Sequence, residues 1–159
     1  MIWPPFLWMI VFFLMLTGGA SGSTAGGIKW VRLAIFAKAA NAEIKRRIHP
    51  NAVIPIRFNG LTLREQTTSN VVAFMFFYMA IIIAASLCFC ACGIGFDESL
   101  GVAVSMIGNV GVSIGQWGSS GCYAAFPTIA KWAATFVMLI GRLEIFTVLL
   151  LFSRALWKK

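Results

Sequence analysis

The chain has 159 residues, of which 60% are hydrophobic and only 11% are charged, with a mean hydropathy of +0.87. Soluble domains carry roughly a quarter charged residues, so this composition excludes an ordinary soluble protein and predicts a membrane protein. The formal net charge is +8, and eight of the thirteen basic residues lie between Lys29 and Arg64. These charges occupy polar gaps between apolar runs, a distribution that the positive-inside rule explains without a nucleic-acid partner.

The N-terminal part of the chain reads as a helix that is broken in the middle. Residues 2–16 (IWPPFLWMIVFFLML) form an apolar run shorter than the about 20 residues that a membrane span needs. This run lacks the basic start of a signal peptide and is taken as part of the mature protein. The stretch TGGASGSTAGGIK (17–29) follows, and residues 28–48 again have a helical pattern, ending in Lys45-Arg46-Arg47. Five glycines between Gly18 and Gly27 disfavour a continuous helix.

The glycine segment 18–27 allows three interpretations. A phosphate-binding loop requires G-x-x-x-x-G-K-[ST] after a strand, but Ile28 separates Gly27 from the lysine, Trp30 replaces the hydroxyl, and no strand precedes. Two overlapping GxxxG pairs would suit helix packing. The third interpretation is non-helical backbone at membrane depth, which is tolerated where it lines a cavity, and the small polar residues favour this one.

Further along the chain, residues 49–70 are predicted to form a cytoplasmic hairpin and linker, because 49–60 contains two prolines and an Asn-Gly pair. Residues 71–95 are 25 uncharged residues and form the clearest span. Residues 98–107 (ESLGVAVSMI) are apolar but too short to cross, and the glycine-rich GNVGVSIGQWGSSG (108–121) follows them. Residues 132–152 form a last span that contains Arg142 and Glu144.

The charges suggest a topology for these segments. Residues 29–64 and the C-terminus are basic and should be cytoplasmic, whereas residues 96–123 contain Asp97 and Glu98 and no Lys or Arg, and should face outside. Segment 98–107 must then enter the membrane and return to the same side. The alternative is a surface helix followed by an ordinary extracellular loop.

A re-entrant helix followed by glycine-rich backbone can present carbonyl oxygens to a dehydrating cation. The C-terminal, negative end of such a helix would point toward the membrane centre, with Glu98 at the positive end. Neither glycine-rich loop contains an acidic side chain, which argues against a divalent site and favours a monovalent cation. His49 and the cysteines Cys88, Cys90 and Cys92 form no ligand or catalytic set, so neither an enzyme nor a cofactor is expected.

The elements GGASGSTAGGIK, GNVG and LIGRLEIFTVLLLF, in this order, resemble the Trk/Ktr potassium-uptake family over residues 4–158. That family carries four concatenated span–pore helix–span repeats and is related to the potassium channels. The resemblance implies an all-α membrane protein in which residues 1–48 are the second helix of the third repeat and 71–159 are the fourth. The pore helix would be 98–107 and the filter 108–113. It also implies a multi-pass protein of the bacterial inner membrane that takes up potassium ions, a cytoplasmic nucleotide-binding regulatory subunit, and a homodimer of the full-length protein.

Carried over residue by residue, the resemblance implies that Asn109, Val110 and Gly111 bind potassium through their backbone carbonyls. Family members often continue with a proline and a further glycine, where this chain has Val112 and Ser113. Segment 18–27 and an arginine of the last span would form the gate: Gly18, Gly19, Ser21, Gly22, Ser23, Thr24, Gly26, Gly27 and Arg142. The alternative for Arg142 is an ion pair with Glu144, although residues two apart on a helix point about 200° apart.

A single re-entrant loop cannot surround an ion. We therefore expect the chain to be a fragment of a four-repeat transporter, or to assemble with other repeats. Two alternatives stay open from the sequence: a non-transporting membrane assembly or regulatory subunit, and a sodium-permeable relative.

Overall fold

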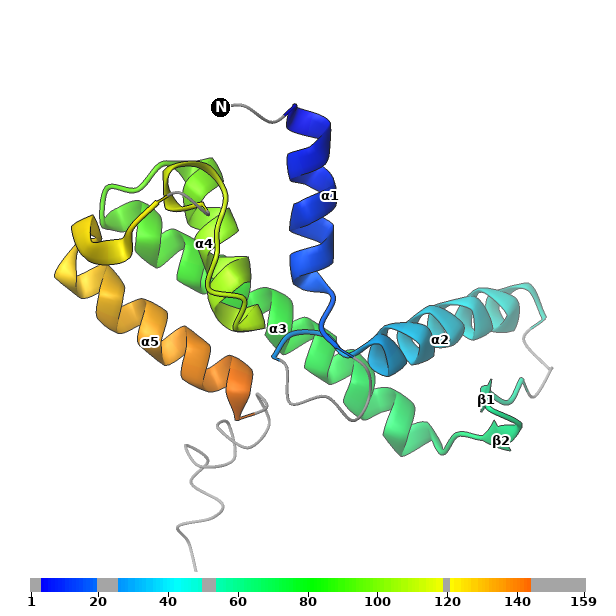
Figure 1. Ribbon diagram of the computed structural model, residues 1–159. Coiled ribbons are helices and arrows are strands. Elements are labelled where there is room, and N and C mark those ends of the chain that lie inside the picture. The colour runs from blue at the N-terminus through cyan, green and yellow to red at the C-terminus, as the bar shows by residue number, and fades with distance from the viewer. Residues whose placement is uncertain (1–3, 20–25, 50–53, 119–120, 144–159) are drawn as a thin grey trace, which may run out of the picture.

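The computed structural model describes residues 4–19, 26–49, 54–118 and 121–143, which are predominantly helical (Figure 1). The helices are α1 (Pro5–Leu16), α2 (Trp30–Ile48), α3 (Glu65–Ala91), α4 (Phe96–Gly108) and α5 (Thr128–Arg142). Two short 3-10 helices, η1 (Gly115–Trp117) and η2 (Tyr123–Ala125), lie between α4 and α5. The strands β1 (Arg57–Phe58) and β2 (Leu61–Thr62) form one hairpin.

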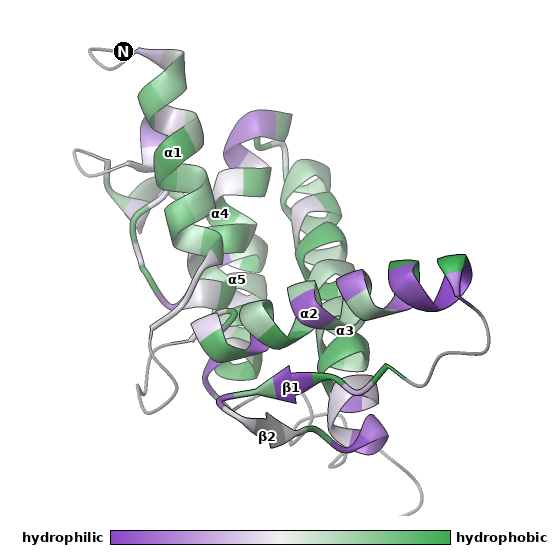
Figure 2. Cartoon of the chain, turned by 90° about the vertical axis from the view of Figure 1, so that its right-hand side faces the viewer, coloured by the Kyte–Doolittle hydropathy of each residue, from purple (hydrophilic) through white to green (hydrophobic). Residues whose placement is uncertain are grey.

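Helix α4 is the core of the structure, although it has only 13 residues. It packs against α3, α5 and α1, and every residue from Gly101 to Gly108 is buried. Figure 2 shows that α4 and the helices around it are mainly hydrophobic. Helix α4 overlaps the predicted 98–107 segment and extends it by Phe96, Asp97 and Gly108. A short helix this deeply buried cannot be a surface helix, which contradicts that alternative.

Helix α3 is, within the described residues, the one helix that is long and apolar enough to cross a membrane. It begins at Glu65 and ends at Ala91, so the predicted range 71–95 was wrong at both ends. Glu65 in the first turn complements the positive helix end, and the helix continues through the polar residues 66–70 that were assigned to the linker. Gly93, with φ of +88°, forms the turn that ends the helix.

The chain between α1 and α2 leaves the helical conformation within the glycine segment. The two limbs of this break are paired: the Gly18 amide donates to the Ile28 carbonyl at 2.7 Å, and the Ile28 amide donates to the Leu16 carbonyl at 3.4 Å. Helix α2 then runs away from α1 in a different direction (Figure 1). Residues 20–25, which include the predicted gating residues Ser21, Gly22, Ser23 and Thr24, lie outside the described residues.

The predicted hairpin forms around Asn59-Gly60, both with positive φ (51° and 81°), as expected for an Asn-Gly turn. Lys38 of α2 holds the first strand, because its Nζ donates to the Arg57 carbonyl at 3.0 Å and lies 5.2 Å from the centre of the Phe58 ring.

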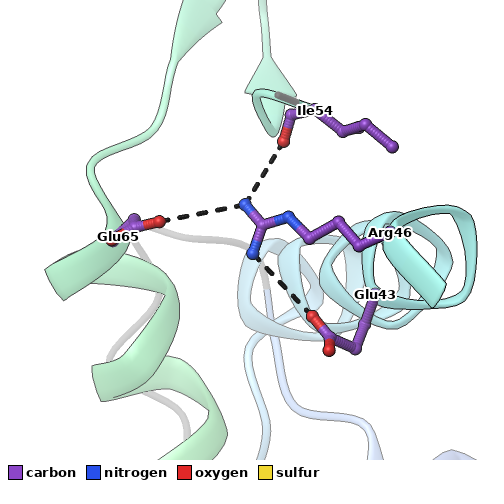
Figure 3. A network of polar contacts seen from close by, with 4 residues as sticks. All are labelled: Glu43, Arg46, Ile54 and Glu65. Carbon is purple, nitrogen blue, oxygen red and sulfur yellow. Dashed lines mark hydrogen bonds and ion pairs between the residues drawn. The ribbon is translucent and has the colours of Figure 1, made fainter. Parts of the chain in front are cut away.

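Arg46 connects α2 to the segment that leads into the hairpin and to the start of α3 (Figure 3). Its guanidinium donates to the Ile54 carbonyl at 3.3 Å and lies 3.8 Å from Glu43 and 3.9 Å from Glu65. The Glu65 side chain is 93% exposed, so these ion pairs orient the elements and contribute little stability.

Helix α5 begins at Thr128, directly after Pro127, four residues before the predicted start of the last span. Arg142 is the last residue of this helix and not the middle of one, a position where a cation complements the negative helix end. Residues 144–159, including Glu144 and the second half of the predicted span, lie outside the described residues.

Candidate functional site

The predicted filter began at Gly108, but this residue is the last of α4, so we call the residues that follow the helix, 109–113, the filter segment. The backbone of this segment is held in an unusual conformation. Asn109 caps the helix in the left-handed region (φ 55°, ψ 34°), and Gly111 also has positive φ, at 82°. Asparagine and glycine are the residues that adopt this region most readily. The backbone N–H of Asn109 donates to the Met106 carbonyl at 3.1 Å, and the backbone N–H of Val110 donates to the Ser105 carbonyl at 2.9 Å. These bonds tie the segment to the last turn of α4.

The same segment has backbone carbonyl oxygens without hydrogen-bond donors in an exposed part of the described chain. Residues 109–112 are exposed, although the helix before them is buried. Among the described residues, none donates a hydrogen bond to the carbonyl oxygen of Asn109, Val110 or Gly111, whereas the Val112 carbonyl accepts from Ser105 Oγ at 2.6 Å. Carbonyl oxygens without a protein donor are suitable ligands for a cation that sheds its water.

Glu98 holds the chain that returns from the filter segment. Its two carboxylate oxygens accept hydrogen bonds from the backbone N–H of Gln116 at 3.2 Å and from Trp117 Nε1 at 3.1 Å. The carboxylate therefore links the first turn of α4 to η1. From the sequence, Glu98 was assigned only to the positive end of the helix, because its partners follow the filter segment and no local pattern identifies them.

Aromatic contacts pack η1 against η2. The Trp117 ring stacks on Tyr123 with centroids 5.9 Å apart and meets Phe126 edge-on at 4.9 Å. Burial raises the pKa of the Tyr123 hydroxyl above its ordinary value.

At the C-terminal end of α4, three segments of the chain approach one another closely. We call this place the glycine junction; its residues are Gly26, Ile107, Gly108, Asn109 and Gly141. A Cβ atom added at Gly26 would lie 2.7 Å from Asn109 Nδ2 and 3.0 Å from the carbonyl oxygens of Ile107 and Gly108. A Cβ atom added at Gly141 would clash with the Ile107 carbonyl. Only glycine lets the glycine segment and α5 approach the end of α4 this closely.

The structure brings some of the predicted gating residues to this junction. Gly27 (φ +83°) lies beside Gly108, and a Cβ atom at Gly18 would lie 2.5 Å from the Gly26 carbonyl oxygen. Gly19 is half-buried, and Arg142 is exposed directly after Gly141. Gly141 was missed in the sequence because a single glycine in an apolar run carries no local signal of a contact with Ile107.

Replacing Glu98 with alanine should lower the free energy of unfolding by about 1–3 kcal/mol, because Trp117 Nε1 and the Gln116 amide lose their acceptors. Thermal unfolding of the purified protein in detergent measures this. Glu43→Ala is the control, because the Glu43 side chain is 58% exposed and its ion pair with Arg46 is long. Equal stability of the two variants would contradict the assigned role of Glu98.

The comparisons with known proteins agree with one another. A family model described as "TrkH: Cation transport protein" matches residues 2–159. The Trk system potassium uptake protein TrkH of Salmonella typhimurium is 34% identical over 157 residues, which are 99% of this chain and 32% of that protein. TrkI of Halomonas elongata is 34% identical over 158 residues, 99% of this chain and 32% of that protein.

A solved structure extends the similarity to three dimensions. The crystal structure of the potassium transporter TrkH from Vibrio parahaemolyticus superposes with a TM-score of 0.86 and 30% identity, covering 98% of this chain and 33% of that one. The chain spans about a third of the length of the relatives it matches.

Proposed function

The chain belongs to the TrkH family of cation transport proteins and has an all-α membrane transporter fold, and from this premise we propose that it forms part of a potassium-uptake pathway in a bacterial inner membrane. The named relatives are potassium uptake proteins. Because the chain spans about a third of their length, the activity we propose is that of a longer polypeptide or an assembly.

The observation that carries this proposal is the segment Asn109–Gly111. It follows the buried end of α4, and its first and third residues, Asn109 and Gly111, have positive φ. Its three carbonyl oxygens accept no hydrogen bond from the described residues. These carbonyls would bind a dehydrated potassium ion, and the negative end of α4 would favour a cation over an anion.

Below this segment, residues 18–27 would act as the gate. Its described ends support the role, because Gly26 and Gly27 contact the last residues of α4, at the inner end of the proposed filter. Ser21, Gly22, Ser23 and Thr24 would complete the gate, and Gly18 and Gly19 would form its first limb. Arg142, next to the glycine junction, would repel a potassium ion and so raise the barrier beneath the filter.

The pathway needs partners, because the proposed filter segment contributes ligands from one side only. The other sides would come from three further repeats of the same polypeptide. We further propose that the full-length protein forms a homodimer with residues 29–64 and its C-terminus in the cytoplasm. There a nucleotide-binding regulatory subunit would dock, and the basic residues Lys45-Arg46-Arg47 would face it or the lipid headgroups.

Growth at low potassium tests the function. The full-length parent, expressed in bacteria that lack other potassium uptake systems, should restore growth at low potassium and accumulate potassium in preference to sodium. Cells with an empty vector are the control. No rescue at normal amounts of membrane-inserted protein would favour a non-transporting assembly, and equal sodium uptake would favour a sodium-permeable relative.

Replacing Arg142 with alanine should raise potassium uptake severalfold, up to about tenfold, because removal of a repulsion of about 1.4 kcal/mol has that effect. Lys131→Ala is the control, since Lys131 lies in the first turn of the same helix and binds the Ala124 carbonyl at 2.8 Å. Initial rates of potassium uptake per amount of protein provide the measurement. Unchanged flux and gating in Arg142→Ala would contradict the barrier role.

A further inference from the structure

We propose that the side chain of Asn109 is a positioning residue, distinct from its backbone carbonyl in the filter segment. It fastens the end of α4 to the last turns of α5 and sets how closely Gly26 approaches the filter segment. Since the consequence is a change in gating, this rests on the proposed function.

The Asn109 side chain contacts each part of the glycine junction. Its Nδ2 donates to the Met138 carbonyl of α5 at 3.2 Å. The same nitrogen lies 2.7 Å from the position that a Cβ atom would take at Gly26 and 3.1 Å from the corresponding position at Gly141. One amide group therefore contacts the glycine segment and α5 from the end of α4.

The backbone of the filter segment is held by a separate set of bonds. The amides of Asn109 and Val110 donate to carbonyls of α4, and Ser105 Oγ donates to the Val112 carbonyl at 2.6 Å. None of these bonds uses the Asn109 side chain. Removal of that side chain should therefore leave the ion-binding carbonyls in place and weaken only the attachment of α5 and the glycine segment.

Glycine at position 109 separates the two roles. The left-handed conformation of Asn109 (φ 55°) is fully accessible to glycine. Asn109→Gly therefore retains the backbone geometry and removes only the side chain with its carboxamide group. Asn59 supplies a matched control, because it has φ of 51° in the turn of the β1–β2 hairpin, which lies away from α4 and α5 (Figure 1). Asn59→Gly makes the same chemical change at the same backbone conformation.

In the full-length parent, Asn109→Gly should raise the maximal rate of potassium uptake about fivefold. That is the effect of losing one hydrogen bond of about 1 kcal/mol, from Asn109 Nδ2 to the Met138 carbonyl, which holds α5 against the end of α4 at the glycine junction. The half-saturating potassium concentration and the potassium-to-sodium ratio should stay at the wild-type values. Asn59→Gly should match the wild type in all three quantities.

A maximal rate unchanged from wild type, or a lost preference for potassium, would overturn the role of the side chain. In both cases wild-type uptake stands, so the proposed function is unaffected. If Asn109→Gly does not accumulate in the membrane, Asn109→Ala replaces it, because alanine cannot donate to the Met138 carbonyl, adds no charge beside the filter segment, and should change the rate in the same direction.

Discussion

Replacing Gly111 with valine in the full-length parent should abolish potassium uptake. Gly111 has φ of +82°, a conformation that costs a β-branched residue up to about 3 kcal/mol. No atom lies within 4 Å of the Cβ position, so within the chain the cost comes from the backbone and not from a clash. To relieve it, the peptide units on both sides must rotate, which turns the carbonyls of Val110 and Gly111 away from the proposed ion site.

A cost of about 3 kcal/mol corresponds to about a hundredfold loss of transport, which initial rates of potassium or rubidium uptake can resolve. Gly93→Val is a closely matched control. Gly93 has φ of +88° and also has no atom within 4 Å of its Cβ position, but it lies in the turn between α3 and α4. The control should therefore lose some stability and keep its transport. Equal loss in both variants would mean that Gly111 acts through folding alone.

Replacing Gly141 with alanine should have the second largest effect. Its Cβ would clash with the Ile107 carbonyl, a backbone group that cannot shift alone because it belongs to the buried part of α4, Gly101 to Gly108. Helix α5 would have to move away from α4, at a cost of about 1–3 kcal/mol in stability, and the Asn109–Met138 hydrogen bond would lengthen. We expect a lower melting temperature together with a severalfold change in uptake.

Gly101→Ala tests whether the backbone contact is the reason. A Cβ atom at Gly101 would lie 3.0 Å from Ser113 Oγ and 3.1 Å from Ile114 Cβ, which are side-chain atoms. These contacts require their neighbours to move by only a few tenths of an ångström, whereas a Cβ atom at Gly141 would clash outright with backbone, and alanine favours a helix over glycine by about 1 kcal/mol. Gly101→Ala should therefore lose clearly less stability than Gly141→Ala. The opposite order would show that the Gly141–Ile107 contact is not limiting.

Local signals in the sequence predicted the helices and the break between α1 and α2. Hydropathy and glycine content act over a few residues, so the apolar runs and the segment 18–27 could be recognised without any tertiary information. The Asn59-Gly60 pair likewise predicted a hairpin, which the structure confirms. The boundaries were less accurate, because polar residues 65–70 continue α3 once Glu65 starts the helix.

The sequence by itself therefore determined the class of protein, the helical elements and the family resemblance, since each depends on composition or on short contiguous motifs. Only the tertiary structure decided which of these elements touch. Glu98 meets Trp117 across the filter segment, and Gly26, Asn109 and Gly141 come from three separate parts of the chain. The sequence does not distinguish a glycine or an asparagine that is exposed from one that packs against a carbonyl. The buried part of helix α4 makes this difference, because the other elements must fit around it.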